Sequence, residues 1–294
     1  MSGNSDISAT KTLILVDWSN LLYRAWFVSR EESWIAFCKF FDMLRMCVHR
    51  SKQEGIPTEI IFAGESRSKL NRSKLCKSYK ANRKPPENLE FRAYRQGLAE
   101  LLEKLGWPLV SYPGAEADDV IASIVKDQCH RCFCKTPCVD CHCADEYTTD
   151  VVIFSGDRDL QQLLAWDRTR IYRAPGVFID KKQFEEEYGI PVTKFTIYKA
   201  LVGDKSDNIT GVNGFGPVKA VTSIIHNTVP EDVYEMGGQK AVEDFEQALE
   251  LVKLDYNCPV DLSRIHSGEP DLSQVSDIDD RILLELKRLR EEFR

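Results

Sequence analysis

The sequence predicts an α/β protein with a mostly parallel central sheet. Apolar runs of four to six residues alternate with helical patterns through the first two thirds of the chain. Short strands separated by helices are typical of βαβ units, whose strands run parallel. With 294 residues, of which 43% are hydrophobic, the chain can bury a sizeable core as one large domain or two small ones.

The expected elements follow from the spacing of apolar residues. Strands are expected at 12–17, 58–63, 107–112 and 150–155, and helices at about 33–50, 88–105 and 116–127. A hairpin is expected at 170–179, around Ala174-Pro175-Gly176. Strands that alternate with helices in this way place their carboxyl ends at one edge of the sheet, where functional groups of α/β proteins gather.

The last third of the chain predicts helices. From about Thr193 the pattern becomes helical and stays so. The segment from Gly211 to Gly216 predicts a tight turn, and Pro217 predicts the first position of the helix that follows. The tail at 282–293 is amphipathic, and we expect it to pack against the body rather than to bind a partner.

The position of the charged residues along the chain says more about the binding partner than the net charge does. The net charge of −7 argues against a nucleic-acid binder, but residues 66–84 hold eight Lys or Arg and no acid, which leaves −15 elsewhere. Such a basic segment can follow a phosphate backbone. A solvated loop is less favoured, because the run includes Tyr79 and two prolines follow it. No apolar run approaches the ~20 residues of a membrane span, and the polar start at 1–10 does not resemble a signal peptide, so a cytosolic protein is expected.

Nine carboxylates lie where strands and helices are expected to begin or end. Asp17 closes the first strand, Glu65 follows the second, and Asp157 follows the fourth. Because the carboxyl ends of parallel strands meet at one edge, we expect these distant segments to converge. The nine residues are Asp17, Glu65, Glu116, Asp118, Asp119, Asp157, Asp159, Asp204 and Asp207.

Convergence of like charges predicts bound cations. Taken alone, the acids at 116–119 could cap a helix, and Asp157 and Asp159 could form a polar turn. Capping uses only one or two acids, however, and several carboxylates held together oppose folding unless cations neutralise them. All-oxygen ligands select Mg²⁺ or Mn²⁺, and two such ions ~4 Å apart would activate water for phosphodiester hydrolysis. No Ser/His/Asp or Cys/His arrangement competes with this interpretation.

Six of the ten cysteines fall between Cys129 and Cys143. They include two Cys-x-x-Cys units separated by five residues, a spacing that suits tetrahedral Zn²⁺. The expected ligands of one zinc are Cys129, Cys132, Cys138 and Cys141, although six thiolates could also hold two zincs with shared sulfurs. A disulfide cluster is disfavoured in a cytosolic protein. The insert should lie on the side of the sheet away from the carboxylates, which favours a stabilising clip or a partner surface.

Five segments carry short motifs in a fixed order: 15–25, 79–83, 114–121, 155–160 and 203–216. Together they resemble the flap endonuclease and 5′-nuclease family, which includes the 5′ nuclease domain of bacterial DNA polymerase I and stand-alone bacteriophage exonucleases. The resemblance implies a PIN-like fold with a helical arch at about 66–95 and a C-terminal region of helix-hairpin-helix type. It divides the chain into a metal-dependent nuclease domain at 11–192 and a helical region at 193–294 that binds duplex DNA.

The resemblance also implies where metals bind. Asp17, Glu65, Glu116 and Asp118 would hold a first metal region with Asp119, Asp157 and Asp159 nearby, and Asp204 and Asp207 would complete a second. Glu65 departs from the family pattern, because relatives usually carry Asp at this position. Its longer side chain could still reach a metal ion or a metal-bound water.

Residues that bind nucleic acid are implied in the same way. Lys80 and Arg83 match basic residues of the family's arch that contact the scissile phosphate, and Arg72 and Tyr79 are further candidates in that segment. Gly211, Gly214 and Gly216, with Lys219, match a turn whose N–H groups hold duplex phosphate without reading sequence. Family members often bind K⁺ at this turn.

The implied function is that of a Mg²⁺-dependent 5′ nuclease that removes flaps or RNA primers in replication or repair. Expected partners are DNA with a 5′ flap or single-stranded 5′ end, an RNA primer–DNA hybrid and, through the zinc insert, a replication protein. A monomer in the cytoplasm of a bacterial or phage-infected cell is expected, with no membrane partner. Two alternatives stay open: a catalytically weak nucleic-acid-binding accessory protein, and a single-strand RNA nuclease. The duplex-binding turn at 211–216 argues against the latter.

Overall fold

A six-stranded sheet forms the centre of the described structure, a computed structural model that covers residues 9–66, 68, 70–83, 88–107, 109–129, 149–262, 268–275 and 277–294. Its order is β3-β2-β1-β4-β5-β6. The strands are β1 Lys11–Asp17, β2 Thr58–Ala63, β3 Leu109–Val110, β4 Thr149–Phe154, β5 Thr169–Arg173 and β6 Val177–Ile179. The first five pair in parallel and β6 runs antiparallel to β5, which confirms the predicted sheet.

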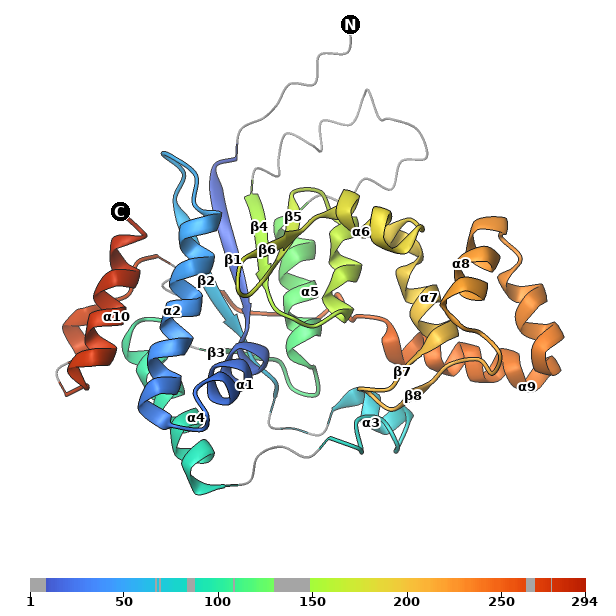
Figure 1. The fold of residues 1–294 in the computed structure, drawn as a ribbon, viewed down its shortest axis with the longest axis horizontal. Coiled ribbons are helices and arrows are strands. Elements are labelled where there is room, and N and C mark those ends of the chain that lie inside the picture. The colour runs from blue at the N-terminus through green and yellow to red at the C-terminus, as the bar shows by residue number, and fades with distance from the viewer. Residues whose placement is uncertain are drawn as a thin grey trace, which may run out of the picture.

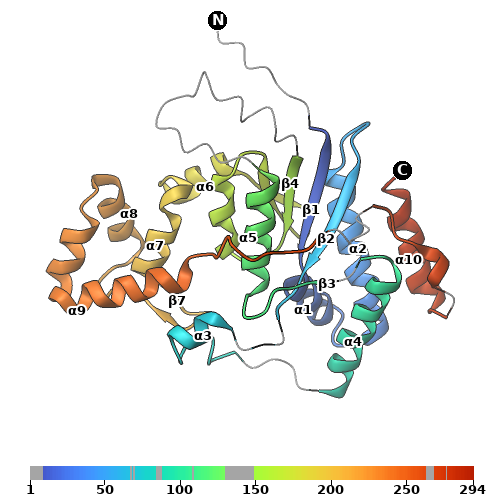
Figure 2. The ribbon, with the colours of Figure 1, turned by 180° about the vertical axis from the view of Figure 1, so that it is seen from behind.

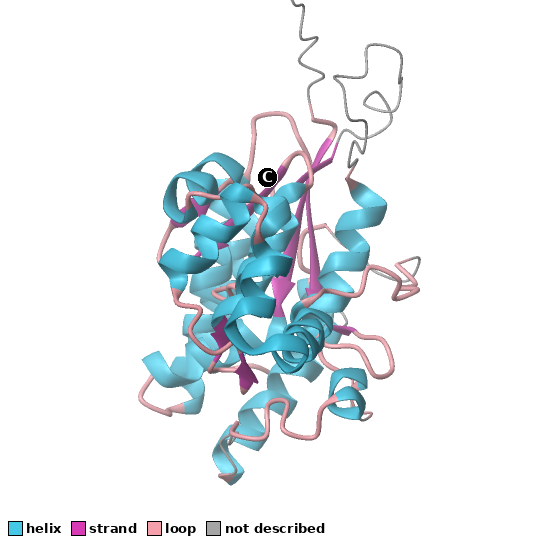
Figure 3. Ribbon diagram, turned by 90° about the vertical axis from the view of Figure 1, so that its right-hand side faces the viewer, coloured by secondary structure: helices cyan, strands magenta, loops and turns pink. Residues whose placement is uncertain are grey.

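Helices cover both faces of this sheet (Figures 1 and 2). One face carries α1 Trp18–Val28, α2 Ser33–Ser51, α4 Leu89–Lys104 and α10 Asp280–Glu291; the other carries α5 Ala117–Gln128, α6 Lys181–Tyr188 and α7 Phe195–Val202. Figure 3 shows the strands between the two sets of helices. Side chains alternate along β1, so Leu13 and Leu15 pack on the α5 side while Ile14 and Val16 pack on the α2 side.

A helical region extends from one side of the sheet (Figure 1). It contains α8 Pro217–His226, α9 Val229–Val252 and a two-stranded ribbon of β7 Gly203–Asp204 and β8 Ile209–Thr210. Helix α9 is broken at Gly237 and Gly238, where φ is −170° and +60°. The second half of α9 contributes Leu251 to an apolar cluster that also contains Tyr79, from the loop after the short helix α3 Asn71–Leu75. The basic segment is thereby joined to the helical region.

Most predicted elements agree with the structure to within one or two residues, but β3 is shorter than expected. The strand was expected at 107–112 and spans Leu109–Val110. Both flanks are taken up by turns, because Trp107 N donates to Leu102 O (2.8 Å) at the end of α4 and Ala115 N donates to Tyr112 O (3.0 Å). The hairpin of β5 and β6 is confirmed.

Of the helices α1 and α10, only α10 was predicted from the sequence. The sequence patterns did not predict α1, which follows β1 with no intervening loop. The tail helix α10 buries Ile282, Leu286 and Leu289 in the core that α2 also lines, as expected. No helix in the described ranges is both long and apolar enough to cross a membrane.

Candidate active site

The strands β1 and β4 end side by side at the carboxyl edge of the sheet. Asp17, the last residue of β1, accepts hydrogen bonds from the backbone N–H of Asn20 (3.0 Å), which caps α1, and from the hydroxyl of Ser155 (2.7 Å) just after β4. Asn20 in turn accepts from the backbone N–H of Gly156 (2.9 Å). These contacts fix the loop that carries Asp157 beside the end of β1.

A cleft of about 1280 Å³ opens at this edge. Its lining includes eight of the predicted metal and phosphate residues: Asp17, Glu65, Glu116, Asp118, Asp157, Asp204, Lys80 and Arg83. The predicted acids Asp119, Asp159 and Asp207 lie behind the lining and bond to residues in it. The fold therefore gathers all nine acids and the two arch residues around one cleft.

Besides the exposed Glu65, three acids that line the cleft form no ion pair with a described Lys or Arg: Asp17, Asp118 and Asp157. Burial raises the pKa of Asp17 from 3.8 to about 6, opposed by the hydrogen bonds from Asn20 and Ser155. Burial, and then the charges of Asp157 and Asp17, raises the pKa of Asp118 well above its usual value. Burial also raises the pKa of Asp157. Desolvation and mutual repulsion thus act together, and a bound cation would relieve both.

The basic segment is docked onto the turn between β7 and β8. Lys80 N donates to Asp207 O (2.9 Å), and the Asn208 side chain donates to Ser78 O (2.8 Å). The Asn82 side chain donates to the carbonyl oxygen of residue 205 (3.0 Å). These backbone contacts hold the loop at 76–83 across the mouth of the cleft, where its side chains face the acids.

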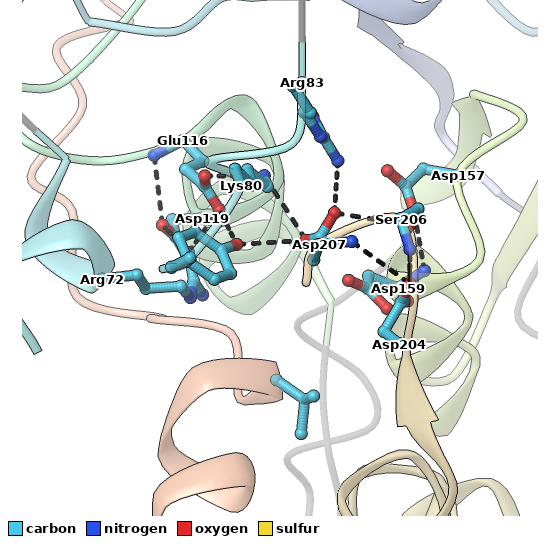
Figure 4. A network of polar contacts seen from close by, with 12 residues as sticks. Arg72, Lys80, Arg83, Glu116, Asp119, Asp157, Asp159, Asp204, Ser206 and Asp207 are labelled. Carbon is cyan, nitrogen blue, oxygen red and sulfur yellow. Dashed lines mark hydrogen bonds and ion pairs between the residues drawn. The ribbon is translucent and has the colours of Figure 1, made fainter. Parts of the chain in front are cut away.

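Side chains of this loop pair with the acids (Figure 4). Lys80 Nζ lies 2.6 Å from Glu116 Oε1, and Arg83 pairs with Asp207. The Tyr79 hydroxyl donates to Glu116 Oε2 (2.9 Å) and to Asp207 Oδ2 (3.2 Å). Burial, followed by the charges of these two acids, raises the pKa of Tyr79 far above its usual value, so this phenol stays a donor. The proposed phosphate-binding cations are thus counter-ions of the acids.

Lys199 belongs to the site, and our sequence analysis missed it. It lies on α7, is 6% exposed, and its ammonium pairs with Asp159 and with Asp204 Oδ2 (2.5 Å). Burial alone would raise the pKa of Asp204, but the hydrogen bonds from Lys199 and Ser206 lower it to about 2. The available signal was a single lysine within the apolar helix Phe195–Val202, five residues before Asp204. A buried lysine of this kind needs carboxylate partners.

The donor set fits a hard divalent cation by its chemistry. The acids offer carboxylate oxygens, the ligands that Mg²⁺ and Mn²⁺ prefer. In the described part of the chain, no three His, Cys, Asp or Glu side chains are close enough to hold a metal ion as they stand. The ammonium and guanidinium groups of Lys80, Arg83 and Lys199 instead occupy acidic oxygens as stand-in cations. Metal binding would therefore require side-chain rearrangement.

The glycine-rich turn lies between β8 and α8, and Pro217, directly after it, lines the cleft. Gly203 and Gly211 are in close backbone contact, since a Cβ on Gly203 would lie 2.4 Å from Gly211 N. Gly214 adopts a φ of +81°, and Gly216 caps α8. Lys219 Nζ lies 4.8 Å from the centre of the Phe215 ring. The turn has the glycines that a close backbone approach requires, and its predicted contact with duplex DNA or K⁺ stays a prediction.

The predicted zinc ligands are only partly within the described structure. Cys129 is buried at the end of α5, with its Sγ 3.6 Å from Thr169 Oγ1. Cys132, Cys138 and Cys141 lie outside the described residues. Because α5 begins at the carboxylate edge, its other end places Cys129 at the opposite edge of the sheet. The zinc site stays a prediction.

Comparison with known sequences gives a consistent result. The model of the family described as 5′-3′ exonuclease, N-terminal resolvase-like domain, matches residues 12–189. A DNA polymerase I from Caldicellulosiruptor bescii is 31% identical over 235 residues, which cover 76% of this chain and 25% of the polymerase. A 5′-3′ exonuclease from Aquifex aeolicus is 28% identical over 279 residues, which cover 90% of each protein. The chain thus spans about a quarter of the length of the first polymerase relative.

Comparison with solved structures shows the same fold. The bacteriophage T5 D15 protein co-crystallised with metal ions is 20% identical, with a TM-score of 0.63 over 97% of this chain and all of that one. Flap endonuclease-1 from Methanococcus jannaschii is 15% identical, with a TM-score of 0.56 over 97% of this chain and 93% of that one. At these identities the likeness supports the predicted PIN-like 5′ nuclease fold.

Proposed function

This chain belongs to the 5′-3′ exonuclease family, and from that premise we propose that it is a divalent-metal-dependent, structure-specific 5′ nuclease. Its substrates would be 5′ flaps or single-stranded 5′ ends of duplex DNA and RNA primers, in replication or repair. The observation that carries the proposal is the cleft in which Asp17, Asp118 and Asp157 lie opposite Lys80 and Arg83. Acids for metal ions and bases for phosphate are the two components that phosphodiester hydrolysis needs.

The acids would hold two ions in two regions. The first would draw on Asp17, Glu65, Glu116 and Asp118, with Asp119, Asp157 and Asp159 nearby; the second would draw on Asp204 and Asp207. Bound Mg²⁺ or Mn²⁺ would supply an activated water and stabilise the leaving oxygen. Glu65 lines the cleft, and its charge contributes to the raised pKa of Asp17, which supports a place for it in the first region.

Lys80 and Arg83 would neutralise the scissile phosphate. Both are now paired with acids, so an incoming phosphate has to exchange with Glu116 and Asp207 as the partner of these cations. The exchange keeps the charges balanced when metal ions take the place of the cations on the acids. Side chains that change partners in this way would couple substrate binding to formation of the metal site.

The remaining predictions concern binding surfaces. Gly211, Gly214, Gly216 and Lys219 would hold the duplex by its backbone, with K⁺ at the turn. Cys129, Cys132, Cys138 and Cys141 would bind Zn²⁺ as a clip or as a docking surface for a replication protein. Metal analysis of purified, reduced protein tests the zinc site, and a preparation without zinc would contradict it.

Incubation of the protein with a 5′-labelled flap duplex, with and without Mg²⁺, tests the proposed function. The expected result is Mg²⁺-dependent release of short 5′ products, with an unstructured RNA strand left intact. Flap binding without cleavage at any Mg²⁺ or Mn²⁺ concentration would instead identify a nucleic-acid-binding accessory protein. Degradation of the RNA strand with the flap left intact would identify a single-strand RNA nuclease.

A further inference from the structure

Arg72 lies where three segments meet behind the cleft (Figure 4). It belongs to α3, is 8% exposed, and is not part of the cleft lining. Its guanidinium donates from Nη1 to Glu116 Oε2 (2.8 Å) and Asp119 Oδ2 (2.8 Å), and from Nη2 to Asp119 Oδ1 (2.6 Å) and the backbone oxygen of Lys253 (2.6 Å). One side chain therefore ties the basic segment to the start of α5 and to the end of α9.

Asp119 has its oxygens committed to this junction. Oδ2 also accepts from the backbone N–H of Glu116 (3.1 Å), as part of the capping box of α5, and Oδ1 also accepts from the backbone N–H of Asp255 (2.9 Å). Each oxygen thus receives one N–H from Arg72 and one from the backbone. Such saturation is typical of a carboxylate that orients its neighbours rather than one that binds a ligand directly.

The two oxygens of Glu116 have different surroundings. Oε2 accepts from Arg72 (2.8 Å) and from the Tyr79 hydroxyl (2.9 Å), whereas Oε1 accepts from Lys80 (2.6 Å). Arg72 is held by four hydrogen bonds, and Lys80 is one of the cations proposed to move onto phosphate. When Lys80 moves from Glu116 to the phosphate, Glu116 Oε1 loses its partner, while Oε2 stays bonded to Arg72 and Tyr79. Glu116 then presents Oε1 in a fixed direction.

We propose that Arg72 is a positioning residue, which holds Glu116 and Asp119 as one rigid unit so that Glu116 offers Oε1 to a divalent cation. The proposal rests on the proposed function, and it assigns Arg72 a role different from the nucleic-acid contact expected from the sequence. To reach a phosphate, the guanidinium would have to break its ion pairs with two buried carboxylates, and Asp119 would keep only backbone N–H donors, which is strongly unfavourable. Lysine could replace it only in part, because a single ammonium cannot match the planar fork that spans these acceptors.

The test measures Mn²⁺ binding to the DNA-free protein and, separately, flap binding in Ca²⁺. For Arg72→Gln we expect Mn²⁺ to bind about 10- to 100-fold more weakly, the usual effect of removing a residue that orients a metal ligand. Flap affinity and its salt dependence should not change. Arg72→Lys should fold and lose part of the affinity for Mn²⁺, which keeps the test usable where the Gln variant does not fold.

Arg45→Gln is the matched control. It removes an arginine that pairs with Asp42 (2.8 Å) and Glu292 (3.7 Å) and does not line the cleft, and it should bind Mn²⁺ like the wild type.

The outcomes separate the inference from the proposed function. A wild-type protein that binds Mn²⁺, beside folded Arg72 variants that bind it equally well, would overturn the inference alone. Weaker flap binding with a salt slope reduced by about 0.9 would show that Arg72 contacts a phosphate. A wild-type protein that neither binds Mn²⁺ nor cleaves the flap would contradict the proposed function itself. Asp119→Asn combined with Arg72→Gln should weaken Mn²⁺ binding no further than Arg72→Gln does, because both residues act on the same ligand.

Discussion

The acids around the cleft form two groups that differ in how their charge is balanced. The unpaired group, Asp17, Asp118 and Asp157, has raised pKa values and no ion pair with a described Lys or Arg. The paired group, Glu116, Asp119, Asp159, Asp204 and Asp207, is neutralised by Arg72, Lys80, Arg83 and Lys199. Carboxylates around one cleft are thus balanced in two different ways.

The unpaired acids indicate where a bound cation would stabilise the protein. Removing one partner of a buried ion pair costs about 3–5 kcal/mol, because the other charge is left uncompensated. Buried acids that face each other destabilise the metal-free protein, and strongly perturbed groups of this kind cluster at functional sites. A divalent cation would therefore bind most favourably at the unpaired group. The paired acids and their cations would hold that group in place.

The largest expected effect comes from Asp157→Asn, in the unpaired group. We expect flap cleavage to fall by more than about 100-fold, since even residues that only orient a metal ligand contribute 10- to 100-fold. DNA binding should be retained, because the basic segment and the glycine-rich turn are untouched. Single-turnover cleavage and flap binding in Ca²⁺ measure the two properties, and full activity in this variant would contradict the two-metal assignment.

Asp17 should make the stability of the metal-free protein depend on pH. Its pKa is about 6 in the folded protein against 3.8, so the folded state binds this proton more tightly than the unfolded chain does. The resulting stabilisation is complete below pH 3.8 and is lost as the pH rises to about 6, a difference of about 3 kcal/mol at 1.36 kcal/mol per pKa unit. Asp17→Asn should therefore stabilise the metal-free protein at pH 7 and flatten its profile between pH 4 and 6.

Asp204, a member of the paired group, should give stability the opposite dependence on pH. The pKa of Asp204 is lowered to about 2, so its contribution is present above pH 3.8 and is lost on acidification toward pH 2. Urea unfolding at several pH values, with Asp17→Asn and Asp204→Asn side by side, measures both slopes. Equal profiles for the two variants would show that the groups do not differ.

Lys80→Ala removes a cation that pairs with Glu116 and is proposed to move onto the scissile phosphate. We expect kcat for flap cleavage to fall by about 100-fold, the usual effect of losing one group that stabilises transition-state charge. Lys52→Ala, which removes a lysine paired with Glu292 (2.9 Å) on the far side of the sheet, is the matched control. A loss of the same size in both variants would indicate a general effect of charge rather than a contact with phosphate.

The smallest effect is expected for Glu65→Ala. Glu65 is exposed at the mouth of the cleft, so its contribution to metal binding should be about 10-fold and visible at limiting Mg²⁺. Glu59→Ala, at the other end of β2 and paired with Lys11 (3.0 Å), should leave cleavage unchanged. If Glu65→Ala behaves like this control, Glu65 is not a ligand.

Much of the sheet and its edge follows from sequence. The apolar runs that end at Asp17 and before Asp157 give the strand ends, and the order of parallel strands places those ends together. Helix α1 escaped prediction because Asp17 closes a strand and also caps the next helix, with no loop residues between them. Because Asp17 was interpreted only as a metal ligand, its role as the N-cap of α1 was not predicted.

The pairing within the site did not follow from sequence. Lys199 lies in an apolar helix, and Arg72 is 44 and 47 residues away from its partners Glu116 and Asp119. Such pairs depend on how α3, α5 and α7 pack, and local patterns carry no information on which cation meets which acid. The sequence therefore predicts which charged residues gather at the site, while the packing of the helices determines which of them form ion pairs.

Binding of Mn²⁺ to the metal-free protein at pH 7 tests most directly whether the unpaired group forms the metal site. Three proteins are compared: the wild type, Asp157→Asn, and Asp150→Asn, which makes the same change in charge at the opposite edge of the sheet beside Arg168 (3.1 Å). We predict that the wild type and Asp150→Asn bind alike and that Asp157→Asn binds far more weakly. Equal binding by all three proteins, or none by the wild type, would contradict this account.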